Sequence, residues 1–462
     1  MDNEIKELSN AVGECRTVST LLLQRNEMLE EIPEQFLLAF MELRILDLTE
    51  CESIKSLPAC LDRLVELRAL RLDKCSNLET LPPVGALAKL QVLVCRWTKI
   101  VALPQGMEKL SSLKLLDLSH NRLTTLLAGT MSCLSNLEYL DMRGNDELKF
   151  IGEAGERLMT QFQEILFLER LIALFIEVDS SACTLESTST LLNRIKKFKK
   201  FELYIGPSES SYMIDNHYMK QVILNDIHQW GERMEWLFAS TNYISFYNCA
   251  GLDAMFDKLI ANSDEVGCFH TVESLAISNY AGSFVVGSNA KFDMLPSLED
   301  ISLVCLTNIS CISDLTVPLG LKFSRLRCII VTLCPQFKYL TTLDDCEQVE
   351  QLFKFDQNSA LFPNLKRIKL VDCPELRFLS EQNVVCPRLE KVSVRNCHLL
   401  KKLPLTTQNI ETIKEIEGEQ VWWDQLEWDN DDINNTFEPL FRPHQHESHH
   451  PSYASDLTIP QF

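Results

Sequence analysis

The sequence predicts an α/β fold built as a repeat solenoid: a curved horseshoe with a parallel β-sheet on its concave face and irregular or short helical segments on its convex side. Three observations predict this fold. Apolar residues recur in the pattern Leu-x-x-Leu-x-Leu-x-x-Cys/Asn. The pattern repeats every 23 to 24 residues. A hydrophobic content of 46% is enough to fill a long interior. Such repeats bury their apolar faces only between neighbouring coils.

The repeat units are clearest in the first third of the chain. Successive units begin at Leu43, Leu67, Leu90, Leu113 and Leu137. The pattern returns in units that begin at Leu298, Leu326, Leu365 and Leu389. Weaker units start near Val18, Leu171, Phe198, Thr241 and Val272. The motif and its period are those of leucine-rich repeats, and roughly thirteen of them fit in the chain.

Each Leu-x-Leu segment predicts a short strand whose two leucines point into the core, while the residue between them points outward. On this register, changing Leu70 or Leu116 to Ala should cost about 2–5 kcal/mol of stability. Changing Asp117, which lies between Leu116 and Leu118, should cost little.

A Cys or Asn follows each strand at the position where the chain must turn inward. Asn121 and Asn145 occupy it in two units, and cysteines occupy it at Cys51, Cys75, Cys249, Cys334, Cys373 and Cys397. A side chain here can satisfy backbone groups that would otherwise be buried without partners. Because these cysteines follow the repeat, we interpret them as buried turn residues and not as a metal or redox site.

The pattern divides the chain into five segments. They are regular N-terminal leucine-rich repeats at 1–151, irregular repeats with insertions at 152–267, C-terminal leucine-rich repeats at 268–405, an acidic Trp-rich cap at 406–440 and a disordered tail at 441–462. We expect longer convex segments in the irregular part, because the leucine pattern is weakest there.

Charge and composition exclude several classes of protein. The net charge of −21 disfavours nucleic acid as a partner, since phosphate contacts need a basic field. No apolar run is long enough to predict a membrane span, and the acidic start does not resemble a secretory signal. The 17 cysteines include no CxxC pair. We therefore expect reduced thiols and a cytoplasmic location.

No pattern of catalytic or cofactor-binding residues is present, so the sequence predicts neither an enzyme nor a cofactor. It lacks a Gly-x-x-x-x-Gly-Lys-Ser/Thr phosphate loop, and Cys397-His398 is not placed as a catalytic pair. Asp429, Asp431 and Asp432 lack the glycine and glutamate of a calcium loop. The histidines of the tail could bind a transition metal weakly, but a solvated end is favoured; they are His444, His446, His449 and His450.

A basic cluster in the irregular part could be a nuclear-localisation signal, but apolar residues between its members favour an ordinary repeat. The cluster consists of Arg194, Lys196, Lys197, Lys199 and Lys200.

Exposed positions on and beside the strands are the candidate protein-binding residues, because solenoids present extended concave surfaces to protein partners. Arg, Trp and Tyr are typical interface anchors. The candidates are Arg71, Arg96, Trp97, His120, Tyr139, Arg327, Lys366, Lys369, Lys391 and Arg395.

The last units also carry Arg325, Arg367 and Arg388, which makes their outward face basic. Residues 411–438 that follow contain ten acidic residues and one lysine. Opposite charges this close favour a tail that folds back over the last repeats, anchored by Trp422, Trp423 and Trp428. A solvated charged face beside a flexible tail is the alternative.

Three segments carry a resemblance to a known family. Residues 18–26 read VSTLLLQRN, residues 36–48 read FLLAFMELRILDL, and residues 418–429 read GEQVWWDQLEWD. Together they resemble the leucine-rich-repeat region of plant disease-resistance receptors of the coiled-coil NLR class. The resemblance implies recognition of a pathogen effector or a guarded host protein. It also implies restraint of a nucleotide-binding domain in a full-length receptor.

Since the sequence contains no such domain and residues 1–8 resemble the second half of a repeat, we expect a truncated product of a longer receptor. The alternative is a stand-alone adaptor or decoy scaffold without a switch function.

Overall fold

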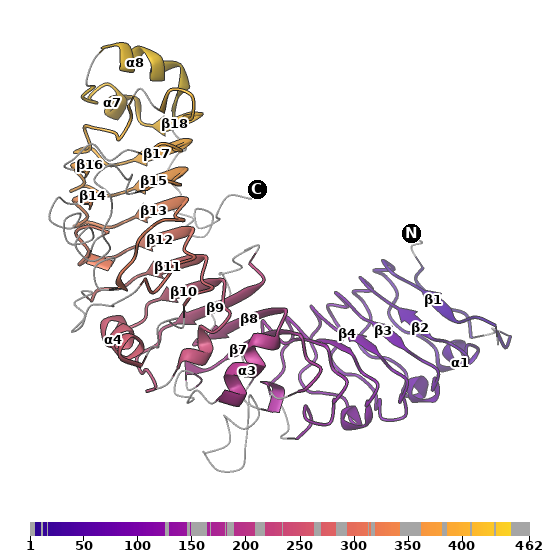
Figure 1. The fold of residues 1–462 in the computed structure, drawn as a ribbon. Helices are drawn as coiled ribbons and strands as arrows, with labels where there is room; N and C mark the ends of the chain where they lie inside the picture. Colours follow the sequence, from indigo (N-terminus) through magenta and orange to yellow (C-terminus); the bar gives the residue numbers. More distant parts are fainter. Residues whose placement is uncertain are drawn as a thin grey trace. The chain divides into compact units, whose positions relative to one another are not determined.

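The structure is a computed structural model of the chain (Figure 1). The description below covers residues 5–10, 13–15, 17–124, 129–145, 148, 164–166, 168–180, 182, 189–207, 218–232, 234–262, 269–282, 293–312, 314–315, 319–341, 362–380, 386–406, 409–428 and 431–444.

The chain forms two compact units. Unit 1 consists of residues 1–182 and 188–210, and unit 2 consists of residues 183–187 and 211–462. Each unit is a series of coils in which one short strand per coil pairs in parallel with the strand of the next coil. The predicted solenoid with a parallel β-sheet is therefore confirmed in both units.

Unit 1 contains an eight-membered series of parallel strands in which each strand pairs with the next in sequence. The strands are β1 (Thr20–Leu22), β2 (Ile45–Asp47), β3 (Ala69–Arg71), β4 (Val92–Val94), β5 (Leu115–Asp117), β6 (Tyr139–Asp141), β7 (Ala173–Val178) and β8 (Lys200–Ile205). The units predicted from Leu43 to Leu137 each supply one of these strands, from β2 to β6.

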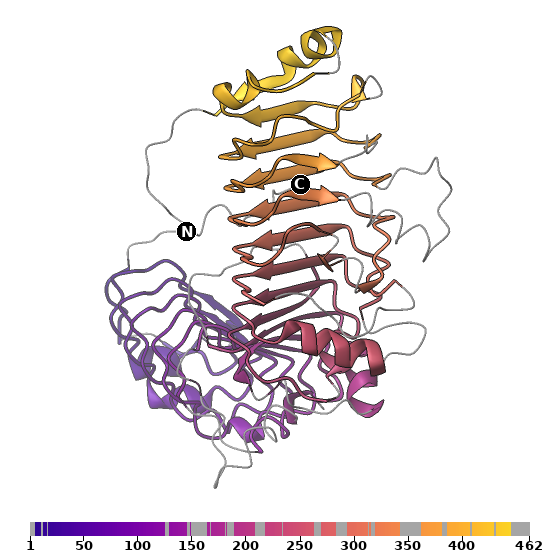
Figure 2. The same ribbon diagram turned by 90° about the vertical axis from the view of Figure 1, so that its left-hand side faces the viewer.

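Unit 2 contains a second parallel series, in which the strands lie one above another (Figure 2). The strands are β9 (Lys220–Asn225), β10 (Tyr243–Tyr247), β11 (Ser274–Ser278), β12 (Asp300–Val304), β13 (Cys328–Thr332), β15 (Arg367–Val371), β17 (Lys391–Arg395), β18 (Glu415–Gly418) and β19 (Phe441–Pro443). A separate two-stranded sheet pairs β14 (Tyr339–Thr341) with β16 (Phe378–Ser380).

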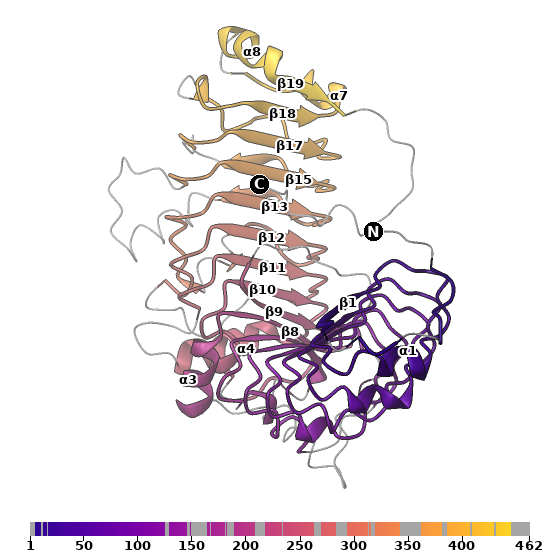
Figure 3. The same cartoon turned by 90° about the vertical axis from the view of Figure 1, so that its right-hand side faces the viewer.

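Short helices connect the strands. The α-helices are α1 (Glu34–Leu38), α3 (Ser189–Lys197), α4 (Leu252–Asn262), α7 (Gln420–Trp423) and α8 (Asp431–Phe437). The 3-10 helices are η1 (Ala59–Arg63), η2 (Met107–Lys109), η4 (Glu235–Leu237) and η6 (Glu438–Leu440). Helix α4 lies on the side of its coil opposite the strands (Figure 3). No helix in the described residues is both long and apolar enough to cross a bilayer.

The inward rows of unit 1 follow the predicted register. Leu70 and Leu116 are fully buried. Leu70 is paired with Leu46 and Leu93, so equivalent leucines stack from coil to coil. Asp117 lies on the other face of its strand as predicted, but neighbouring side chains leave it only 8% exposed. Truncation of Asp117 to Ala therefore removes a buried hydrogen-bond acceptor, and for that change the expectation of a small cost is revised.

The turn residues bond to buried backbone carbonyls, as the sequence predicts. The amide of Asn145 donates to the carbonyl oxygens of Leu118 and Met142, both at 2.9 Å. The thiol of Cys51 donates to Leu23 O at 3.0 Å. The contacts to Leu118 and Leu23 each join the turn of one coil to the strand end of the preceding coil, whereas the contact to Met142 closes the turn within its own coil. Burial raises the pKa of the Cys75 thiol to about 12, so this cysteine is a protonated donor at neutral pH.

The acidic segment after the last repeat continues the sheet instead of lying over the basic face. Strand β18 pairs with β17, and β19 pairs with β18. Trp422 is buried and its indole Nε1 donates to Leu400 O at 2.9 Å. Trp423 stacks on Phe441 with ring centroids 4.4 Å apart. The tryptophans therefore anchor a terminal cap that includes β19 (Phe441–Pro443).

Candidate protein-binding face

The solvent side of strands β2 to β6 forms three rows, which we call the sheet face of unit 1. The first row is apolar and partly exposed, and it consists of Ile45, Ala69, Val92, Leu115 and Tyr139. The second row lies two residues further along each strand, and it consists of Asp47, Arg71, Val94, Asp117 and Asp141. The third follows the strand ends, and it consists of Thr49, Asp73, Arg96, Ser119 and Arg143.

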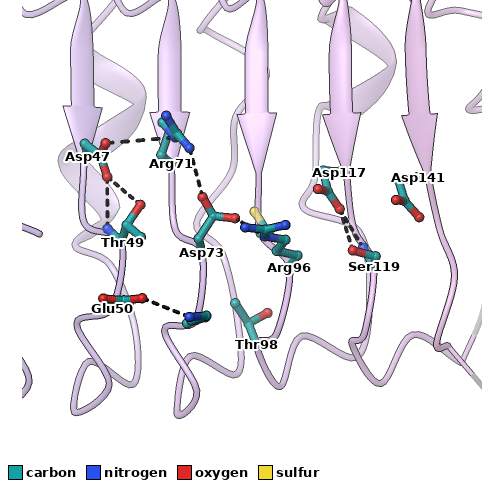
Figure 4. Close-up of polar contacts among 12 residues, drawn as sticks. Asp47, Thr49, Glu50, Arg71, Asp73, Arg96, Thr98, Asp117, Ser119 and Asp141 are labelled. Atoms are coloured by element: carbon teal, nitrogen blue, oxygen red, sulfur yellow. Dashed lines mark hydrogen bonds and ion pairs between the residues drawn. The ribbon is translucent and has the colours of Figure 1, made fainter. Parts of the chain in front are cut away.

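Buried aspartates hold the arginines of this face in place (Figure 4). The carboxylate of Asp73, whose side chain is 3% exposed, accepts from Arg96 Nε at 2.9 Å and from Arg71 Nη2 at 3.3 Å. Asp47 Oδ2 lies 3.9 Å from Arg71 Nε. Its Oδ1 accepts from the backbone amide and hydroxyl of Thr49 at 3.0 and 2.6 Å. The acids form a lower layer and the guanidinium groups an upper, exposed layer.

Asp117 has no arginine partner within the described residues. Its Oδ1 accepts from the backbone amide and hydroxyl of Ser119 at 3.0 and 2.7 Å. Burial raises the pKa of this carboxyl above its ordinary 3.8, and the nearby charge of Asp141 raises it further. The folded protein therefore favours the protonated form of the Asp117 carboxyl more than water does.

We expect Asp117→Asn to raise the free energy of unfolding at pH 7, because the amide oxygen keeps the two Ser119 bonds without a buried charge. Because the pKa of Asp117 is raised in the folded state, its ionised form lowers the free energy of unfolding. This loss of stability appears as the pH rises above the ordinary pKa of 3.8. Urea unfolding of both proteins at several pH values measures this. The gain in free energy of unfolding of Asp117→Asn over the wild type should shrink toward zero near pH 3.8. A gain that does not change with pH would contradict the mechanism.

A second ionic cluster ends the face at β6 and β7. Arg143 Nη2 lies 2.7 Å from Asp141 Oδ2, and its Nη1 lies 3.0 Å from Glu202 Oε2. The same guanidinium lies 4.7 Å from the ring centroid of the buried Phe175. The hydroxyl of Tyr139 donates to Asp141 Oδ2 at 3.4 Å. Arg143 is therefore held on three sides, and Tyr139 belongs to this cluster.

The residue that precedes each turn Cys, Thr or Asn adopts positive φ and forms a further row, which we call the turn row. Its first five members, with φ between 54° and 62°, are Arg25, Glu50, Lys74, Trp97 and His120. The backbone amide of each donates to the next coil, as from Trp97 N to Ser119 O at 3.1 Å. The rings of Trp97 and His120 stack with centroids 4.1 Å apart and an interplanar angle of 8°. Trp97 is 47% exposed.

Gly144 is the next member of the turn row, with φ of 66°. A β-carbon at Gly144 would overlap the imidazole Nδ1 of His120. We expect Gly144→Ala to displace His120 from Trp97 and to cost about 1–3 kcal/mol, including the strain of a positive φ. Gly129→Ala is the matched control, because its φ is 81° and its β-carbon would meet nothing within 4 Å. Thermal unfolding and tryptophan fluorescence compare the two; a fluorescence change as large in Gly129→Ala would contradict the assignment.

The other predicted binding residues lie in unit 2. Lys369, Lys391 and Arg395 lie on β15 and β17. Lys391 Nζ is 2.9 Å from Glu415 Oε2 and 2.6 Å from Glu417 Oε1 of the cap strand. Acidic residues of the cap therefore already neutralise part of the predicted basic face.

Arg327 and Lys366 each lie immediately before a strand, β13 and β15 respectively. There they pair with glutamates at the same position of neighbouring coils. Arg327 Nη1 lies 2.9 Å from Glu299 Oε2, and Lys366 Nζ lies 3.1 Å from Glu390 Oε1. Ion pairs between exposed side chains of this kind contribute little stability.

The remaining sequence motifs find structural roles or lie outside the description. Arg194 of α3 is buried and donates to several backbone carbonyls, among them Leu166 O at 2.7 Å and Leu171 O at 2.9 Å. It is therefore not available as part of a nuclear-localisation signal. Among the described residues, no group of three or more His, Cys, Asp or Glu is placed to hold a metal. His446, His449, His450 and Asp429 lie outside the described residues.

Comparison with known proteins decides the family. A sequence model of a leucine-rich repeat region matches residues 34–259. A disease resistance protein of Arabidopsis thaliana is 33% identical over 473 residues, which cover 96% of this chain and 47% of that protein. A probable disease resistance protein of the same plant is 30% identical over 452 residues, covering 92% of this chain and 48% of that protein. The chain is a leucine-rich-repeat region similar to those of plant disease-resistance proteins. This leucine-rich-repeat region spans about half the length of the curated relatives it matches.

Solved structures of leucine-rich-repeat proteins also match the leucine-rich-repeat region. An LRR protein of Leptospira interrogans has a TM-score of 0.38 and 17% identity, covering 93% of this chain and 94% of that chain. The functional domain of InlJ from Listeria monocytogenes, which includes a cysteine ladder, has a TM-score of 0.44 and 13% identity, covering 92% of this chain and 73% of that chain.

Proposed function

We propose that the sheet face of unit 1 is the surface with which a plant intracellular immune receptor recognises a pathogen effector or a host protein that an effector has modified. The carrying observation is the layer of half-exposed Arg71 and Arg96 side chains, held from below by Asp47 and Asp73 and bordered by the exposed Trp97. Arg and Trp at fixed positions are the anchors that protein interfaces use most. The region acts by binding and not by catalysis.

We also propose that the region restrains a nucleotide-binding switch domain in a full-length cytoplasmic receptor. The relatives are disease resistance proteins about twice as long as this chain, which leaves room for such a domain in them. A partner that binds one face more tightly in the released state than in the restrained state shifts the population toward release.

Proximity labelling in leaves tests the recognition surface. The chain is expressed with a fused labelling enzyme in infected and uninfected tissue, as wild type and as the variant Arg71→Ala/Arg96→Ala/Trp97→Gly. The control variant, Arg325→Ala/Val421→Ala, changes exposed residues of unit 2. We expect proteins that are labelled only in infected tissue, by the wild type and the control but not by the sheet-face variant. Identical labelling by all three would overturn the proposal.

A further inference from the structure

We infer that the sheet face of unit 1 is built to bind an acidic amphipathic helix, whose carboxylates meet Arg71 and Arg96 while its apolar side chains cover the first row. This inference rests on the proposed function and specifies the partner's chemistry. It starts from the exposures on the face. The Arg71 and Arg96 side chains are 49% and 48% exposed, whereas those of Asp47 and Asp73 are 8% and 3% exposed. A partner therefore meets guanidinium groups, not carboxylates.

The hydrogen bonds of Arg96 leave the outer edge of its guanidinium open. Arg96 bonds to Asp73 through Nε alone, and within the described residues neither Nη atom has a partner. The two Nη groups are the edge that pairs with a carboxylate through two parallel hydrogen bonds. Because Asp73 already fixes the orientation of the guanidinium, little side-chain freedom is lost when a partner binds.

Trp97 supplies an apolar border to this cationic site. It adopts positive φ, which is sterically unfavourable for a bulky side chain, and it is 47% exposed. The ring is held flat by His120, and Gly144 leaves the space that His120 occupies. An exposed aromatic ring that is stacked on a neighbouring ring beside an open arginine is typical of a binding site.

The spacing of the apolar row favours a helix as the occupant. Ile45, Ala69, Val92 and Leu115 are in register on adjacent strands, which lie about 4.8 Å apart. A helix that crosses the strands advances about 5.4 Å per turn, so successive turns meet successive coils. Its diameter of about 10–12 Å is close to the distance of about 13 Å between the first and third rows, which are four residues apart along the chain. The apolar stripe and the acidic edge of one helix can therefore be engaged together.

A pair of synthetic peptides tests the inference with the full chain. Both are 18-residue helices with a leucine stripe, one with glutamates along one edge of the stripe and one with lysines in their place. Calorimetric titration should give a Kd at least tenfold lower for the acidic peptide, and added salt should weaken its binding. Equal affinity for both peptides, or no binding of the acidic one, overturns the inference.

Two variants locate the binding. Arg96→Gln should weaken binding of the acidic peptide about tenfold, the usual loss for a charge-assisted hydrogen bond. The fold of this variant should persist, because Asp73 keeps Arg71 as an ion-pair partner. Trp97→Gly should also weaken it, since glycine adopts the positive φ without strain. Arg325→Gln in unit 2 is the control and should bind as the wild type does. Unchanged affinity in Arg96→Gln, with thermal unfolding also unchanged, overturns the inference.

The outcomes separate this inference from the proposed function. If labelling in leaves depends on the sheet face but the acidic peptide does not bind, the recognition surface stands and the acidic helix is wrong. If labelling is independent of the sheet face, the proposed function fails whatever the peptide does.

Discussion

Asn121→Ala should lower the free energy of unfolding of unit 1 by about 4 kcal/mol, because it leaves several buried polar groups without partners at once. Asn121 Oδ1 accepts from the backbone amide and hydroxyl of Thr98 at 2.9 and 2.6 Å. Its Nδ2 donates to Cys95 O and Leu118 O, both at 2.9 Å. The side chain thus joins two coils through four hydrogen bonds in a place that water does not reach.

Urea unfolding combined with hydrogen exchange of residues 92–123 measures this loss. In a repeat array the damage should be greatest in the two coils that share the turn. Asn136→Ala is the matched control, since its amide makes one bond, to Ser111 O at 2.6 Å, at the surface. The control should lose less than about 1 kcal/mol. Comparable losses in the two variants would show that the turn amide does not have the role described.

Trp422→Ala should destabilise the terminal cap by about 3–5 kcal/mol, the usual range for truncating a buried aromatic. Trp422 is 2% exposed, packs against Gly418 and bonds to Leu400 O. It therefore connects α7 to the last coil and holds β18 in place. Loss of the ring leaves a cavity where the cap meets β17, so β18 and β19 should separate from the sheet before the remainder of unit 2 unfolds.

Hydrogen exchange of residues 415–418 and 441–443 follows this separation directly. Val421 precedes Trp422 on the same helix and is 67% exposed, so Val421→Ala is the control and should leave exchange unchanged. If Trp422→Ala speeds exchange to the same extent throughout unit 2, with no earlier exchange in the cap, then the tryptophan does not act as an anchor.

The repeat pattern was sufficient to predict most of the strands. A period of 23 to 24 residues fixes which residues of each coil pair with the next, and Leu70 and Leu116 are buried where it places them. Strand β9 was missed because its sequence, Lys220–Asn225, lacks the flanking leucines. Helix α4 could have been predicted from the spacing of its apolar residues. Its buried residues Leu252, Met255, Phe256 and Leu259 follow helical spacing.

The candidate site was predictable only in part. Arg71, Arg96, Trp97 and His120 were identified as exposed positions beside strands, and the structure places them on adjacent coils. The aspartate layer beneath them was not predicted, because burial of Asp73 depends on arginines from two different coils. The positive φ of the turn row was also missed. The position before each turn Cys or Asn is the signal that locates it.

The turn row has a consequence for how such a surface can change over generations. At this position the main chain makes the bond between coils, so the side chain is free to vary while the framework stays the same. Equivalent positions already hold the unlike residues Glu50, Lys74, Trp97 and Asn248. One substitution in the turn row therefore changes which partners the surface binds while the fold stays the same. Many of the described coils offer such a position, and new specificities can be assembled from them one coil at a time.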